Sequence, residues 1–177
     1  NGASITNSGT IKVVGTGDTN NIGVFLNTGS TGVIGSGSGT PSIEVSGDNS
    51  TGVLVTGKDS GGVASSLVMK GNVKVSGDSI SGIIANETSV TLEGNATVTV
   101  DNNGAVSSPI GAKGSYGIIV KGSTGKFEGK NTTVDVKITN PESIGLYSEG
   151  NLTVNKANII ARNGALNFFA NNGKIEV

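Results

Sequence analysis

The sequence predicts an all-β protein that folds as a right-handed parallel β-helix, a solenoid of stacked coils. Three observations predict this fold: an excess of β-branched residues, a repeat of roughly thirty residues, and many glycines without proline-rich tracts. The chain holds 20 Val and 16 Ile against 7 Leu, and Val, Ile and Thr fit pleated strands better than helices. The 30 glycines beside only 3 prolines indicate frequent tight turns.

One strand type of the repeat begins with a small residue that is followed by three mostly apolar positions. Its copies begin at Gly23, Gly52, Gly82, Gly117, Gly145 and, in degraded form, Ala165. Successive side chains of a strand point to opposite faces. We therefore expect Val24 and Leu26 to point into the solenoid and Phe25 to point outward.

Two further strand types complete each coil. The second alternates apolar and polar residues at 11–13, 43–45, 73–75, 98–100 and 134–136, and the third occurs at 31–34, 67–69, 90–92, 126–127, 152–154 and 175–177. Ile43, Val45, Val73 and Val75 should point inward, and Glu44 and Lys74 outward. Because each strand type returns one coil later, we expect like to stack on like in about six coils of three short strands.

The whole chain, 1–177, is interpreted as a single β-helix segment. The longer stretch at 101–115 is interpreted as a loop that is extruded from one corner. Solenoid ends normally carry atypical capping repeats, and neither end of this sequence resembles one. We therefore expect the segment to belong to a longer rod.

The composition narrows the range of partners. The chain has no cysteine, which excludes a disulfide framework and a thiolate metal site. Its 12 basic and 13 acidic residues form no basic patch that would indicate nucleic acid or anionic lipid. No apolar run approaches the length of a membrane-spanning helix.

Parallel β-helices include polysaccharide lyases and hydrolases, so a polysaccharide-degrading enzyme is the alternative from another functional class. Such chemistry uses paired carboxylates, a basic residue and often Ca²⁺. The chain has no histidine and one arginine, Arg162, and its acids are scattered along outward strand positions such as Glu44 and Asp135. We therefore predict no catalytic residue and no cofactor.

Three aspartates recur at a fixed spacing. Asp18, Asp48 and Asp78 each follow a glycine and lie 30 residues apart, so they should stack at one corner, about 4.8 Å apart. Such a ladder could hold Ca²⁺. An Asx-type turn, in which each carboxylate caps backbone N–H groups, is the favoured interpretation, and we predict no metal site.

The predicted facing creates an outward apolar column of Phe25, Leu54, Ile84, Ile119 and Tyr147. Contiguous apolar surface often marks a contact site, so these five residues are the candidate partner-binding residues. Reversed facing, or cover by loops, is the alternative, and burial of all five would rule the column out.

The repeat resembles a known family in the stretches Asn-Ser-Gly-Thr-Ile-Lys-Val at 7–13, Ser-Gly-Asp-Asn-Ser-Thr-Gly-Val at 46–53 and Ser-Tyr-Gly-Ile-Ile-Val at 115–120. These resemble the passenger domains of large Gram-negative autotransporter adhesins, which use type V secretion, and the fusobacterial outer-membrane adhesins look most similar. The resemblance covers nearly the whole chain, and it lies in the pattern of the repeats and in the composition.

The resemblance implies a virulence-associated, secreted passenger at the cell surface. Its link to the outer membrane would be a C-terminal barrel outside these residues. It further implies attachment to host cells or to other bacteria through a surface protein or a glycan. A passive stalk that carries a toxin or protease domain elsewhere in a longer chain is a further alternative. No family motif assigns a binding role to a numbered residue.

Overall fold

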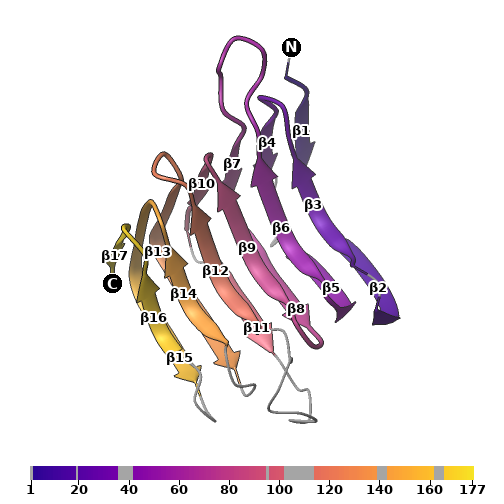
Figure 1. Ribbon diagram of the computed structural model, residues 1–177. Coiled ribbons are helices and arrows are strands. Elements are labelled where there is room, and N and C mark those ends of the chain that lie inside the picture. The colour runs from indigo at the N-terminus through magenta and orange to yellow at the C-terminus, as the bar shows by residue number, and fades with distance from the viewer. Residues whose placement is uncertain are drawn as a thin grey trace.

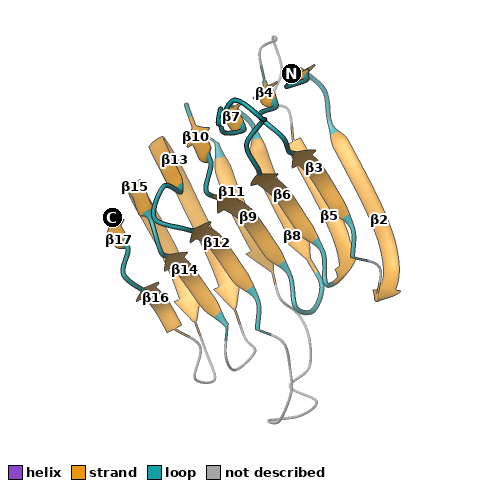
Figure 2. Ribbon diagram, turned by 45° about the horizontal axis from the view of Figure 1, so that its top comes forward, coloured by secondary structure: helices purple, strands orange, loops and turns teal. Residues whose placement is uncertain are grey.

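A computed structural model confirms the predicted fold class. It describes residues 2–18, 20–35, 42–94, 96–101, 114–138, 143–161 and 166–177, and these ranges hold 17 strands and no helix (Figure 2). The strands pair in parallel, each with the equivalent strand of the neighbouring coil. They form a parallel β-helix of six coils and the first strand of a seventh (Figure 1).

The strands belong to three parallel sheets, and each coil contributes to all three. The first sheet contains β1 (Ser4–Asn7), β4 (Thr31–Ile34), β7 (Ser66–Met69), β10 (Ser89–Leu92) and β17 (Lys174–Glu176). The second contains β2 (Ile11–Asp18), β5 (Ser42–Asp48), β8 (Asn72–Ser76) and β11 (Thr97–Asp101). The third contains β3 (Ile22–Leu26), β6 (Thr51–Thr56), β9 (Ser81–Asn86), β12 (Tyr116–Lys121), β14 (Ile144–Ser148) and β16 (Leu166–Ala170).

Two long strands run through both the first and the second sheet. β13 (Lys126–Ile138) and β15 (Asn151–Ala161) begin in the first sheet and continue into the second. Their mutual register shifts between Gly129 and Thr133, at the point where the other coils turn a corner. The fifth and sixth coils therefore replace a turn by an irregularity within one strand.

The core consists of like residues stacked on like, as the repeat predicted. In the second sheet Ile43 pairs with Val73 and Val73 with Val98, and all three are completely buried. Lys74 is exposed and Glu44 is half-buried, so the predicted facing is confirmed. Full burial of one such side chain stabilises a fold by roughly 1.5–3 kcal/mol, and the buried side chains form one continuous cluster.

The recurring glycine of the third sheet has a steric cause. A Cβ on Gly52 would lie 2.6 Å from the Gly82 carbonyl oxygen and 2.6 Å from Cγ1 of Val73. Gly52 lies within β6 and does not have a positive φ, so the left-handed region is not what requires a glycine here. Close approach of backbone from the next coil requires the glycine instead.

The corner between the second and third sheets does use the left-handed region. Asn20, Asn49 and Ser79 have φ values of 48°, 57° and 55°, and Asn is among the non-glycine residues that tolerate this region best. The N–H of Asn20 donates to the Asp48 carbonyl, and the N–H of Asn49 donates to the Asp78 carbonyl. The corners therefore stack in register like the strands.

Candidate functional site

The outward apolar column exists as a ladder on the third sheet. Phe25 pairs with Leu54, Leu54 with Ile84, Ile84 with Ile119 and Ile119 with Tyr147. The side chains between them in each strand, such as Val24 and Val53, are buried. The column therefore points outward, and one sheet face brings together all five residues.

Exposure along the column is uneven. Phe25 is 54% exposed, and Leu54, Ile84 and Tyr147 are half-buried. Ile119 is only 5% exposed, so the expectation that it is accessible is wrong. Ile119 has bulky column neighbours on both sides, whereas Phe25 has one on one side only among the described residues. Ile119 therefore supports the column and contributes little contact surface.

The structure adds Phe169 to the column, which sequence reasoning missed. If Ala165 were the equivalent of Gly145, as the repeat suggested, Leu166 would lie beside Leu146. Instead, Leu166 pairs with Ile144 and Phe169 pairs with Tyr147. The expected register was wrong by two residues because Ala165 was taken as the equivalent of the recurring glycine. The order large, aromatic, small in Phe168-Phe169-Ala170 matches Leu146-Tyr147-Ser148 and was the signal for the correct register.

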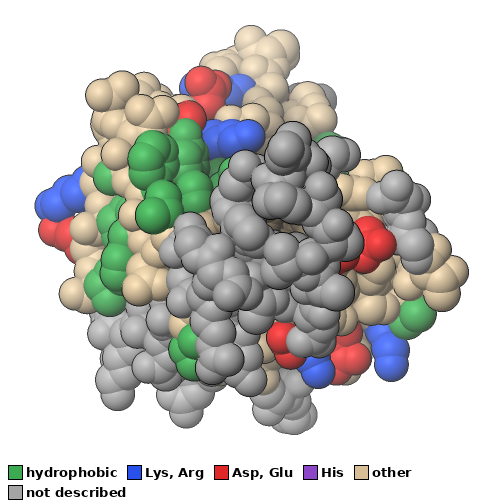
Figure 3. Space-filling view, turned by 60° about the horizontal axis from the view of Figure 1, so that its bottom comes forward, with side chains coloured by type: hydrophobic (Ala, Val, Ile, Leu, Met, Phe, Trp, Pro, Cys, Tyr) green, Lys and Arg blue, Asp and Glu red, His purple; other side chains and the backbone are tan. Residues whose placement is uncertain are grey.

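Three aromatic rings cluster at the C-terminal half of this face. Tyr147 stacks on Phe169 with ring centroids 5.6 Å apart and an interplanar angle of 21°. Tyr116 meets Tyr147 edge-to-face at 6.3 Å. These are the geometries that aromatic pairs prefer. Figure 3 shows hydrophobic side chains gathered on the side where β14 and β16 lie in Figure 1.

A polar network fixes the edge of this aromatic cluster. The Tyr147 hydroxyl donates to Glu149 Oε1 at 2.6 Å, and Asn171 Nδ2 donates to the same hydroxyl at 3.3 Å. The Gly122 N–H donates to Glu149 Oε2 at 3.0 Å. The carboxylate therefore ties the fifth coil to the turn that precedes it and holds the Tyr147 ring in place.

The network also shifts two pKa values. The hydrogen bond from the Gly122 N–H, followed by that from Tyr147, lowers the pKa of Glu149. The hydrogen bond that the Tyr147 hydroxyl donates to Glu149 is the main cause of the raised pKa of Tyr147. At neutral pH the pair therefore consists of a carboxylate and a neutral phenol. This arrangement orders a surface that combines aromatic carbon with hydrogen-bonding groups at its rim.

The chain also extrudes a loop between β6 and β7, at 57–65, that the sequence did not predict. Lys58 and Ala64 form an antiparallel bridge, and the Asp59 carboxylate accepts the N–H groups of Gly61 and Val63 at 2.9 Å each. The loop projects beyond the sheets at the top of Figure 1 and presents an exposed Val63. The loop predicted at 101–115 lies mostly outside the described residues.

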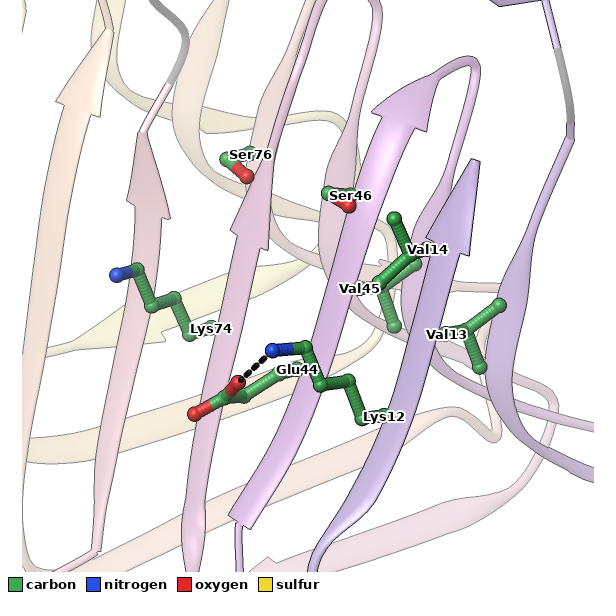
Figure 4. Close-up of a pocket in the computed structure, with 8 residues that line it drawn as sticks. All are labelled: Lys12, Val13, Val14, Glu44, Val45, Ser46, Lys74 and Ser76. Atoms are coloured by element: carbon green, nitrogen blue, oxygen red, sulfur yellow. Dashed lines mark ion pairs between the residues drawn. The ribbon is translucent and has the colours of Figure 1, made fainter. Parts of the chain in front are cut away.

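A shallow hollow of about 180 Å³ lies on the outer face of the second sheet (Figure 4). Lys12, Glu44 and Lys74 line one side, and Ser46 and Ser76 line the other. Lys12 and Glu44 form an exposed ion pair at 3.8 Å. Exposed pairs of this kind contribute little stability, and the hollow is a groove between two side-chain columns.

The aspartate ladder caps a turn at Asp48, whereas Oδ1 of Asp78 is buried and has no hydrogen-bond partner among the described residues. Asp48 Oδ1 accepts the Asp78 N–H at 2.9 Å, so the carboxylate caps the turn one coil onward. Asp18 is paired with Asp48 through the backbone, and its side chain lies outside the described residues. Within the described ranges, no three acidic side chains converge as metal ligands would. Arg162 and the side chain of Asp135 also lie outside those ranges.

Comparison of the chain with protein-family models, with curated proteins and with solved structures found no match. No described helix is long and apolar enough to cross a membrane.

Proposed function

We propose that the chain is a structural and adhesive segment of a surface-exposed autotransporter passenger. In this role a stacked rod holds contact surfaces away from the outer membrane. The segment either attaches directly to host cells or to other bacteria, or it acts as a spacer for the part of the passenger that attaches. The continuous core supports the rod, because each coil is stabilised by its neighbours. The repeat pattern, which resembles that of fusobacterial adhesins, supports a location at the bacterial surface.

The observation that carries the adhesive role is the outward column of the third sheet. Its two end residues, Phe25 and Phe169, are large aromatic side chains with about half of their surface open to solvent. Aromatic residues are enriched among the side chains that dominate protein contacts. The loop at 57–65 is a second contact point, since its Asp59 cap preorganises the backbone that presents Val63.

Attachment of the purified chain to epithelial cells and to bacteria of other species tests the proposal. Phe25→Ser and Phe169→Ser should each lower attachment, and the double variant should abolish it. Val14→Ser is the matched control, because Val14 is also an exposed apolar residue, at 66%, but lies on the outer face of the second sheet. Equal loss in Val14→Ser would contradict a specific surface, and no attachment by any form would favour the passive stalk.

The polysaccharide-degrading alternative is tested separately. Incubation of the chain with uronate polymers should leave their length unchanged. Cleavage that is lost on replacement of Arg162 or of the outward acids would overturn the adhesive proposal and establish the enzymatic one.

A further inference from the structure

The turn between β16 and β17 combines two structural demands that together create a reactive dipeptide. Asn172 has a φ of 58°, in the left-handed region that asparagine tolerates better than most residues. The next residue must be glycine, because a Cβ on Gly173 would lie 2.6 Å from the Ser148 carbonyl oxygen. Stacking on the fifth coil thus requires the glycine at 173, and the left-handed φ before it is one that asparagine tolerates, at an exposed corner.

The same corner one coil earlier meets the steric demand without the reactive residue. There Glu149 precedes Gly150, and a Cβ on Gly150 would collide with the Gly125 carbonyl oxygen. Glu149 does not have a positive φ, but Glu87, in the turn after β9, has a φ of 55°, so the left-handed position at this corner does not need an asparagine side chain. Asn172 is an amide at a position where other coils use a chemically stable residue.

Backbone hydrogen bonds hold the residues on both sides of the Asn172–Gly173 dipeptide, while the dipeptide's own donor groups make none to any described residue. The Asn171 N–H donates to the Ser148 carbonyl and the Lys174 N–H donates to the Gly150 carbonyl. Within the described residues, neither the Asn172 side chain nor the Gly173 N–H makes a hydrogen bond. The Gly173 nitrogen is therefore available to react, and no side chain on Gly173 obstructs its approach to the neighbouring amide.

We propose that Asn172–Gly173 is a site of spontaneous deamidation, a modification that needs only water. The Gly173 nitrogen attacks Cγ of Asn172 and loses its proton to solvent. Nδ2 takes up a proton from solvent, the Cγ–Nδ2 bond breaks and ammonia leaves, which completes a cyclic imide. Water then adds to either imide carbonyl and opens the ring, to aspartate or to isoaspartate. Asparagine is among the residues that are chemically labile in proteins.

The modification would loosen the turn between β16 and β17 and the start of the seventh coil. Isoaspartate inserts one additional carbon into the main chain between the anchors at Asn171 and Lys174, and both products add a negative charge. The backbone bond from Lys174 to Gly150, which starts the pairing of β17 with β15, should be lost. The contact of Asn171 with the Tyr147 hydroxyl should weaken, and the aromatic face would lose part of its polar anchor.

The test is incubation of the full chain at neutral and at mildly alkaline pH, followed by fragment-ion mass spectrometry. Sequencing of fragments is needed because the tryptic peptide 163–174 contains a second Asn–Gly pair at 163–164. Acid at position 172 should accumulate faster than at Asn151, which precedes leucine, and faster at the higher pH. Asn172→Gln should show no conversion at this position, since its longer side chain closes the ring poorly.

A synthetic peptide of residues 163–177 separates the chemistry from the fold. The proposal would be overturned if the peptide deamidates at position 172 but, in the folded chain, Asn172 deamidates no faster than Asn151. The deamidated fraction should exchange the amide hydrogens of Lys174, Ile175 and Glu176 faster than the unmodified chain. Unchanged exchange in that fraction would contradict the proposed loosening of this turn and of β17.

Discussion

The third and the sixth coil carry equivalent inward residues on the third sheet, yet these residues differ in burial. Ile83 is paired with Val53 on one side and Ile118 on the other, and it is completely buried. Among the residues that the structure describes, Phe168 is paired only with Leu146, and it is 47% exposed. Burial in this fold therefore comes from neighbouring coils and is not a property of the residue or of its own coil.

The hollow at the C-terminal edge makes the same point. Phe168, Ala170, Ile175 and Val177 line an open apolar hollow of about 320 Å³. In the middle coils the equivalent space is filled by side chains of the continuous core. A substitution should thus cost most in the middle of the stack and least at this edge.

Phe127→Ala against Phe168→Ala tests this comparison with the largest expected effect. Phe127 is completely buried between Val90 and Leu152, and its truncation should lower the free energy of unfolding by about 3–5 kcal/mol. Phe168→Ala should cost about 1 kcal/mol or less. Urea denaturation measures both, and equal losses would contradict control of burial by neighbouring coils.

Gly52→Ala tests how closely the middle coils approach one another. The added methyl group would meet the Gly82 carbonyl oxygen and Cγ1 of Val73 at 2.6 Å, so we expect a loss of about 1–3 kcal/mol. Gly9→Ala is the control in the first coil, because its nearest atom would lie 4.0 Å away. Thermal unfolding should separate the two variants, and a neutral Gly52→Ala would show that the coils can move apart.

Thr28→Asn tests a strained corner at the other end of the stack. Thr28 is exposed and has a φ of 56°, a conformation that is costly for a β-branched residue. Asparagine should relieve part of this strain and raise the free energy of unfolding by about 0.5–1 kcal/mol. A lower melting temperature than that of the unchanged chain would contradict this account of the corner.

Glu149→Gln tests the polar anchor of the aromatic cluster, with the smallest expected effect. The raised pKa of Tyr147 stabilises the fold below the ordinary tyrosine value of 10.0, and this contribution is lost as the pH rises through the folded-state pKa. The lowered pKa of Glu149 stabilises the fold above 4.5, and this contribution is lost as the pH falls through the folded-state pKa.

Absorbance of the ionised phenol measures this effect, and the chain has only two tyrosines and no tryptophan. Removal of the Glu149 charge should move the titration of Tyr147 to lower pH. The Tyr147→Phe variant identifies which of the two tyrosine titrations moved. An unchanged Tyr147 titration in Glu149→Gln would show that the carboxylate does not hold the hydroxyl.

The sequence predicted the strands and their facing because the repeat exposes both. Alternation at 43–45 and 73–75 sets which side chains face the core, and the structure confirms it for Ile43, Val45 and Lys74. The sequence could not predict the burial of Ile119 or the contact of Tyr147 with Glu149. Both depend on how side chains of separate coils pack together, and a repeat period carries no information on that packing.

The last coil and the 57–65 loop show where repeat reasoning fails. Ala165 is small like the recurring glycine, and treating the two as equivalent predicted the wrong register for the last coil. The backbone pairing places Phe169 beside Tyr147 instead. The loop follows Gly57, and its shape depends on the Asp59 carboxylate and two N–H groups. One-copy features of this kind leave no periodic signal.

Amide hydrogen exchange along the third sheet tests the central claim, a stacked rod stabilised by its neighbouring coils, most directly. We expect the slowest exchange in β6, β9 and β12, faster exchange in β14, and the fastest exchange in β16, which among the described strands pairs with β14 alone. Uniform protection from β3 to β16 would contradict it, because burial and stability would then not depend on neighbouring coils.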